Sequence, residues 1–159
     1  MTGKGSCLLA SCMIFLLFSC GSKKEGLSFN ALLEAADTHS VSGDTRSAVR
    51  VLDSARDAAQ SPLQYLGVYK RQMAAGSSKE AEKTLKVAIR KHSDSLELRA
   101  VYSWFLYESG SLGQALGQAK KLQGTRYASI PAQFQLQEAQ KNGSTDYLSL
   151  DYASIYADA

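Results

Sequence analysis

The sequence contains little proline, histidine or tryptophan. Of its 159 residues, two are proline, two are histidine and one is tryptophan. Proline interrupts helices, so this scarcity, together with a middle region rich in Ala, Leu, Gln, Glu, Lys and Arg, favours helix. The length leaves room for one domain. The net charge of +3 is too small to indicate a nucleic-acid-binding protein.

The sequence also lacks the usual signs of catalysis. His39 and His92 are far apart, and His39 lies two residues from Asp37, a spacing that does not place both side chains on one helical face. There is no Ser-x-x-Lys, no Gly-x-Ser-x-Gly and no phosphate-binding glycine-rich loop. We therefore expect no catalytic residue, no metal and no cofactor, and a protein that is not an enzyme.

The one long apolar run is at the N-terminus. It extends from Cys7 to Phe18, is broken only by Ser11 and follows the basic Lys4. This run is shorter than the ~20 residues that a bilayer-spanning helix needs. A basic start, a short apolar segment and small residues at its end are typical of a secretory signal peptide.

The end of this segment resembles the signal peptides of bacterial lipoproteins, through the residues Leu17, Phe18, Ser19 and Cys20. The resemblance implies cleavage before Cys20 and a diacylglycerol on its thiol, with palmitate among the acyl chains. Residues 1–19 are then a lipoprotein signal peptide, and residues 20–27 a lipidated cysteine and a flexible tether. A competing box ends at Cys12, but cleavage there leaves Met13 to Phe18 on the mature chain. An uncleaved or plainly secreted signal is the other alternative.

Four glycines recur along the rest of the chain: Gly43, Gly76, Gly110 and Gly143. The interval between them is about 34 residues, which we call one repeat length and which is typical of helix-turn-helix repeats. Glycine adopts the positive φ that a tight turn between antiparallel helices needs. An alanine stands at the fifth position after each of the first three glycines, at Ala48, Ala81 and Ala115. A small alanine lets the second helix lie close to the first.

Apolar residues between these turns are spaced by three and four, which predicts helices. Ser61 followed by Pro62 indicates a stop and a new helix start, and Pro131 opens a seventh helix that ends at Asn142 and Gly143. An eighth is expected from Asp146 to Tyr156. Whether this last segment is a capping helix or a binding tail stays open.

The glycine and alanine pairs resemble the tetratricopeptide repeat (TPR) family, as do Leu52 with Ala55 and Leu85 with Ala88. The fourth unit departs from the pattern, with Leu148 in place of the alanine. The resemblance implies an all-α fold, a right-handed α-solenoid of about four TPR-like units over residues 28–156. The alternative is an irregular helical bundle.

A partner-binding groove is implied by the same resemblance, because TPR grooves are lined by one side of each unit's first helix. Ala100, Trp104 and Tyr107 lie opposite Val101, Tyr102 and Phe105 on their helix. An exposed Trp–Tyr pair is a plausible peptide anchor, since aromatic residues dominate binding hot spots; the alternative is that Trp104 is buried against the fourth unit. By position the groove holds Leu33, Asp37, Leu66, Lys70, Met73, Trp104, Tyr107 and Glu108.

A basic stripe is the other surface feature. Lys79, Lys83, Lys86 and Arg90 are spaced by four, three and four, so they share one face of a helix. The stripe either contacts anionic lipid or is a solvated face that Glu80 and Glu82 interrupt.

These features predict a membrane-anchored scaffold of the bacterial cell envelope that binds a protein or peptide in a concave groove. The anchor lies in the inner or outer membrane, with the periplasmic face preferred; partner and oligomeric state stay open. An accessory lipoprotein of an envelope transporter is the alternative, and it predicts a deep apolar cavity. A third alternative, an envelope hydrolase or its regulator, predicts acidic groups with shifted acidity in one cleft. A spacer without a specific partner is a fourth.

Overall fold

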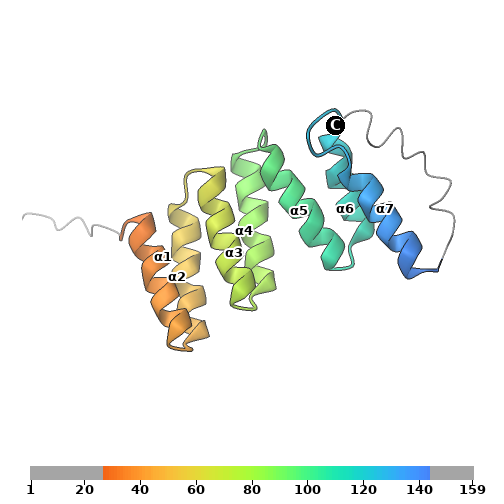
Figure 1. Ribbon diagram of the computed structural model, residues 1–159. Coiled ribbons are helices and arrows are strands. Elements are labelled where there is room, and N and C mark those ends of the chain that lie inside the picture. The colour runs from red at the N-terminus through yellow and green to blue at the C-terminus, as the bar shows by residue number, and fades with distance from the viewer. Residues whose placement is uncertain (1–26, 144–159) are drawn as a thin grey trace, which may run out of the picture.

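The computed structural model describes residues 27–143, and this part of the chain is all-helical, without strands (Figure 1). The predicted all-α fold is confirmed. The signal peptide, Cys12, Cys20 and the eighth helix predicted over residues 146–156 lie outside the described residues. The helices are α1 (Phe29–Val41), α2 (Thr45–Ala58), α3 (Pro62–Ala74), α4 (Ser78–Lys91), α5 (Leu96–Glu108), α6 (Leu112–Ala119) with the short 3-10 helix η1 (Lys120–Leu122), and α7 (Ile130–Lys141).

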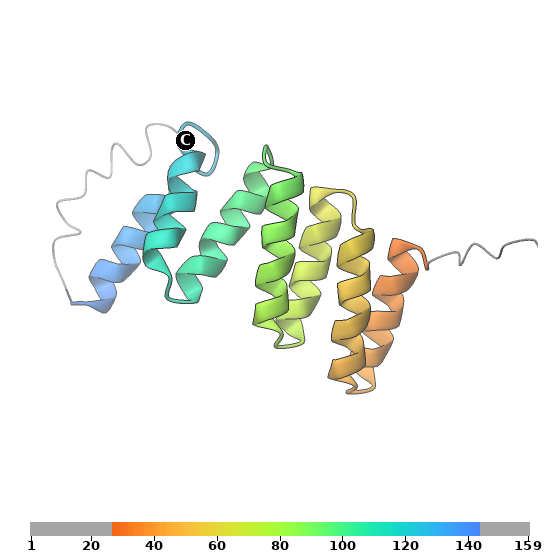
Figure 2. The ribbon, with the colours of Figure 1, turned by 180° about the vertical axis from the view of Figure 1, so that it is seen from behind.

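The helices pack as consecutive antiparallel pairs. α1 packs mainly on α2, α3 on α4 and α5 on α6. The pairs lie beside one another in sequence order, and α7 follows α6 (Figures 1 and 2). This alternation places the N-terminal ends of α1, α3, α5 and α7 at one edge of the array and their C-terminal ends at the other.

The three turns within these pairs are closed by the same hydrogen bonds. In each, a backbone N–H just after the glycine donates to a carbonyl in the last turn of the first helix, as in the Schellman motif. The bonds join Asp44 N to His39 O (2.9 Å), Ser77 N to Gln72 O (2.9 Å) and Ser111 N to Leu106 O (2.8 Å). Gly43, Gly76 and Gly110 have φ of 79°, 72° and 81°, which explains the glycine at these positions.

The helix starts recur with the same period as the turns. The first helix of each pair, and α7, begins after a serine, and these serines follow one another by one repeat length: Ser28, Ser61, Ser95 and Ser129. The second helices begin after Asp44, Ser77 and Ser111. Ser61 forms a full capping box with Gln64, which satisfies backbone donors at the start of the helix. Each pair therefore carries its own start and stop residues.

Small residues sit where the two helices of a pair cross. Ala48, Ala81 and Ala115 are each 0% exposed. Larger apolar side chains fill the remaining space in two clusters, one around Leu52 in the first pair and one extending from Tyr65 to Phe134. Phe29 packs against both clusters, so the apolar interior continues from one pair to the next.

Helix α5 is buried on more sides than its sequence predicts. Ala100 and Tyr107, expected on an exposed side, are 5% and 6% exposed, and Trp104 is half-buried. The ring of Phe134 on α7 explains this difference: its centroid lies 4.8 Å from that of Trp104 and 4.5 Å from that of Tyr107. Trp104 thus packs against α7, and the Trp–Tyr pair is not an open surface.

Candidate functional site

The residues expected to line a groove lie on equivalent positions of successive first helices. Asp37, Lys70 and Trp104 follow one another by one repeat length, on α1, α3 and α5. Lys70 and Glu108 are exposed, whereas Met73 is half-buried and Leu66 is buried. On α3 and α5 the accessible residues of this surface are Lys70, Met73, Trp104 and Glu108, which we name the first-helix face. Asp37 on α1 is also exposed.

Asp37 is bound within the fold. Both of its carboxylate oxygens accept hydrogen bonds from Arg71 on α3, Oδ1 from Nε at 2.8 Å and Oδ2 from Nη2 at 2.9 Å. This bond holds the pKa of Asp37 below its ordinary value. The two-pronged contact joins α1 to α3. Arg71 was not among the predicted groove residues, although it follows Asp37 by one repeat length.

Tyr69 connects the two helices of the first-helix face. Its ring meets that of Phe105 edge-on, with centroids 6.3 Å apart. Burial, and to a smaller extent the charge of Glu108, raise the pKa of Tyr69. Lys70 and Glu108 are exposed residues of opposite charge on α3 and α5, the helices that also carry the half-buried Met73 and Trp104.

The basic stripe lines an open hollow on the outer side of α4. The hollow has a volume of about 720 Å³, and its wall includes Tyr102 of α5 together with residues of α4. Lys83 lies 3.7 Å from Glu80 and Lys86 lies 2.5 Å from Glu82. Glutamates thus compensate two of the four cations in the stripe. The lining residues are Lys79, Glu80, Glu82, Lys83, Lys86, Ile89, Arg90 and Tyr102.

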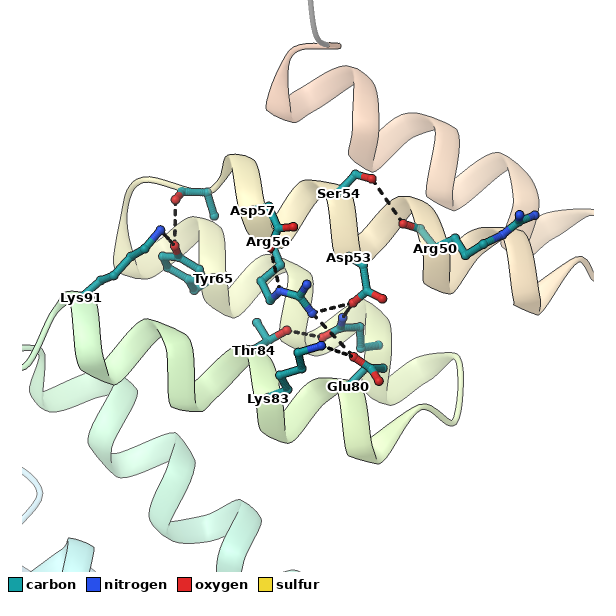
Figure 3. A network of polar contacts seen from close by, with 12 residues as sticks. Arg50, Asp53, Ser54, Arg56, Asp57, Tyr65, Glu80, Lys83, Thr84 and Lys91 are labelled. Atoms are coloured by element: carbon teal, nitrogen blue, oxygen red, sulfur yellow. Dashed lines mark hydrogen bonds and ion pairs between the residues drawn. The ribbon is translucent and has the colours of Figure 1, made fainter.

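A buried polar cluster lies where α2, α3 and α4 meet (Figure 3). The side chain of Arg56 is 8% exposed and is paired with three carboxylates. Its Nη1 lies 2.6 Å from Asp53 and 3.6 Å from Glu80, and its Nε lies 3.0 Å from Asp57. An arginine so far from water needs such partners, because a lone buried charge is costly.

Gln72 and Thr84, both 0% exposed, complete this cluster. The Thr84 hydroxyl donates to Gln72 Oε1 at 2.7 Å, and the Gln72 amide donates to Asp53 at 3.5 Å. Burial raises the pKa of Asp53, and Arg56 opposes that shift. A carboxyl with shifted acidity is one feature expected of the hydrolase alternative. Here, however, the carboxyl is used in contacts that join three helices.

The two histidines have structural neighbours. His39 Nδ1 lies 3.8 Å from Asp44 at the first turn, and the His92 ring packs at 5.8 Å from that of Tyr65. Within residues 27–143, no three His, Cys, Asp or Glu side chains come together as a metal site would require.

Comparison with protein-family models, curated proteins and solved structures found no match to this chain. Over the described residues, every helix falls short of the length or apolarity required to cross a bilayer.

Proposed function

We propose that this chain is a lipid-anchored, TPR-like scaffold of the bacterial cell envelope, a right-handed α-solenoid of about four units. It binds a protein or peptide partner and performs no chemistry of its own. One observation carries the proposal: three helix pairs, each one repeat length after the last, are closed by the same turn bonds, with a fully buried alanine at the fifth position after each glycine. Repeats of this kind stack into extended surfaces for other chains.

The first-helix face is the surface to which we assign the partner. It offers the half-buried Met73 and Trp104 together with the exposed Lys70 and Glu108. Apolar surface flanked by opposite charges suits a peptide that brings both an apolar side chain and charged groups. Leu66 and Tyr107 support this face from within the fold. Asp37 is half exposed and is held by Arg71.

An accessory lipoprotein that binds a small ligand for a transporter remains the second candidate. A small-ligand site is typically an enclosed, mostly apolar pocket. The hollow on α4 is instead open and lined largely by charged side chains, which favours the scaffold.

The partner site is tested by photo-crosslinking in cells. A photoreactive residue at Lys70 is expected to give a discrete adduct that Trp104→Ala abolishes. The matched control is the same photoreactive residue at Lys83, an exposed lysine on α4, which is expected to give no such adduct. Equal adducts from both positions, or an adduct that Trp104→Ala leaves intact, would contradict the assignment.

The anchor is tested separately by metabolic labelling with palmitate. Cys20→Ser is expected to abolish the label and Cys12→Ser to keep it. The reverse result would move the anchor to Cys12, and a label that persists undiminished in the double variant would show that another residue carries it.

A further inference from the structure

One edge of the array has a distinctive surface. The described chain begins at Leu27 on this edge, and the α2–α3, α4–α5 and α6–α7 connections return to it (Figures 1 and 2). We name it the starting edge; it comprises residues 27–28, 58–63, 90–97 and 120–129. The opposite edge is formed by the three glycine turns and the end of α7.

Each of the three helix pairs has one exposed leucine at the starting edge. Leu27 is 63% exposed, Leu63 is 79% exposed and Leu96 is 38% exposed. Leu63 and Leu96 are one repeat length apart, at the first turns of α3 and α5. Among the described residues, the opposite edge has one exposed large apolar side chain, that of Val41, which is 90% exposed.

Cations are concentrated on two segments of this edge, residues 90–97 and 120–129. The starting edge carries five cations and two anions, and all five cations are exposed. Glu97 pairs with Arg126 at 3.1 Å, and Lys91 donates to the Tyr65 hydroxyl at 2.8 Å. Asp94 is the other anion within these segments, and the exposed Asp57 next to them is paired with Arg56. Arg90 also belongs to the basic stripe, which continues from this edge along α4. The five cations are Arg90, Lys91, Lys120, Lys121 and Arg126.

Distance along the chain limits how far this edge can lie from the anchor. Leu27 is seven positions after Cys20, and seven positions at full extension span no more than ~25 Å. The thirteen residues of α1 place the opposite edge about 20 Å further away.

We propose that the starting edge rests on the anionic phospholipid surface of the membrane that holds the anchor. The leucines enter the headgroup region and the lysines and arginines contact the phosphates, as in other peripheral membrane surfaces. The helices then stand upright on the bilayer, with the first-helix face accessible from the side. This inference rests on the proposed lipid anchor at Cys20.

The test uses the full-length, lipidated protein reconstituted into vesicles of phosphatidylglycerol and brominated phosphatidylcholine. Leu63→Trp and Val41→Trp place a reporter at exposed positions on the two edges, and the parent, with Trp104 alone, supplies the baseline. We expect Leu63→Trp to show blue-shifted, quenched emission and Val41→Trp to match the parent. Equal quenching of both reporters, or quenching of Val41→Trp alone, would overturn the inference.

Charge is tested in the Leu63→Trp background. Lys120→Gln with Lys121→Gln is expected to lower the ratio of quenched to unquenched molecules about fivefold for each charge removed, whereas Arg46→Gln on the opposite edge leaves it unchanged. Basic residues at helix C-termini also stabilise helices through the dipole. If the lysine variants lower the unfolding midpoint but leave quenching unchanged, the two lysines stabilise the helix ends only, and the inference fails.

The mass of the purified protein shows whether Cys20 is lipidated. It therefore distinguishes failure of the membrane-contact inference from failure of the proposed lipid anchor. An unmodified Cys20 refutes the lipid anchor. The two tryptophan reporters are then compared with excess lipid, where a Leu63→Trp signal still supports membrane contact and its absence refutes it.

Discussion

Arg56 shows how a single residue can join several helices. Its buried guanidinium pairs with Asp53 and Glu80, whose side chains are 34% and 28% exposed. We expect Arg56→Ala to lower the free energy of unfolding by about 3–5 kcal/mol, because removal of one partner leaves carboxylates without compensation in a poorly solvated site. Urea unfolding followed by circular dichroism measures this loss.

Arg71→Ala is the matched control for that experiment. Its partner Asp37 is half exposed, and exposed ion pairs contribute about 1 kcal/mol or less. A similar loss in both variants would show that burial does not govern the contribution of these arginines.

Asp53 and Asp37 are expected to give opposite pH dependence. The pKa of Asp53 is raised above the ordinary 3.8, so the folded state binds its proton more tightly and stability falls as the pH rises through the folded pKa. The pKa of Asp37 is lowered from the same ordinary 3.8, so its contribution is present above that value and is lost as the pH falls. Urea unfolding between acidic and neutral pH, with Asp53→Asn and Asp37→Asn, measures both slopes. Slopes of the same sign would be inconsistent with these environments.

For individual residues, the sequence predicted exposed positions better than it predicted polar side chains that take part in contacts between helices. Lys70 and Glu108 lie at the surface, as their pattern predicts. Arg56 and Arg71 were missed because a hydrophobic pattern assigns charged residues to the outside. Arg56 follows Leu52 by four residues and precedes Ala59 by three, a position on the apolar stripe that could have identified it.

Among the elements, the glycine turns and the helical glycines are expected to respond oppositely to alanine. Gly76 has φ of 72°, where a Cβ costs about 1–2 kcal/mol. Gly117 lies within α6, and a Cβ added there meets no atom within 4 Å, so Gly117→Ala should stabilise by about 1 kcal/mol. Thermal unfolding of the two variants measures both effects. A stabilising Gly76→Ala would contradict the turn geometry.

Helix limits were predictable because their signals are local. Ser61 with Pro62 opens α3, and Asn142 ends α7 as expected. The recurrence of serine N-caps was visible in the sequence but was not used beyond Ser61.

Across the whole molecule, α7 is expected to support the last pair only. Phe134 is 0% exposed against Trp104 and Tyr107, so Phe134→Ala should cost about 3–5 kcal/mol and shift Trp104 emission to the red. Because repeat units contact mainly their neighbours, hydrogen exchange should accelerate in α5–α7 and stay unchanged in α1 and α2. Gln133→Ala, exposed on the same helix, is the control. Uniform acceleration would mean that the array unfolds as one unit.

The order of the pairs followed from the short turns, which require antiparallel neighbours. The contact of α7 with α5 could not be predicted from the sequence. It depends on how far one helix pair is rotated against the next, and residue spacing carries no information about that rotation. The predicted open Trp–Tyr pair failed for this reason.

The recurring serines and glycines bear on how such a chain can change length in evolution. Every pair begins and ends on signals of its own, so a tandem duplication or deletion of one repeat length joins one complete signal to another. A gene of this design lengthens or shortens the reach of its product in steps of one hairpin, without needing new capping residues at the junction.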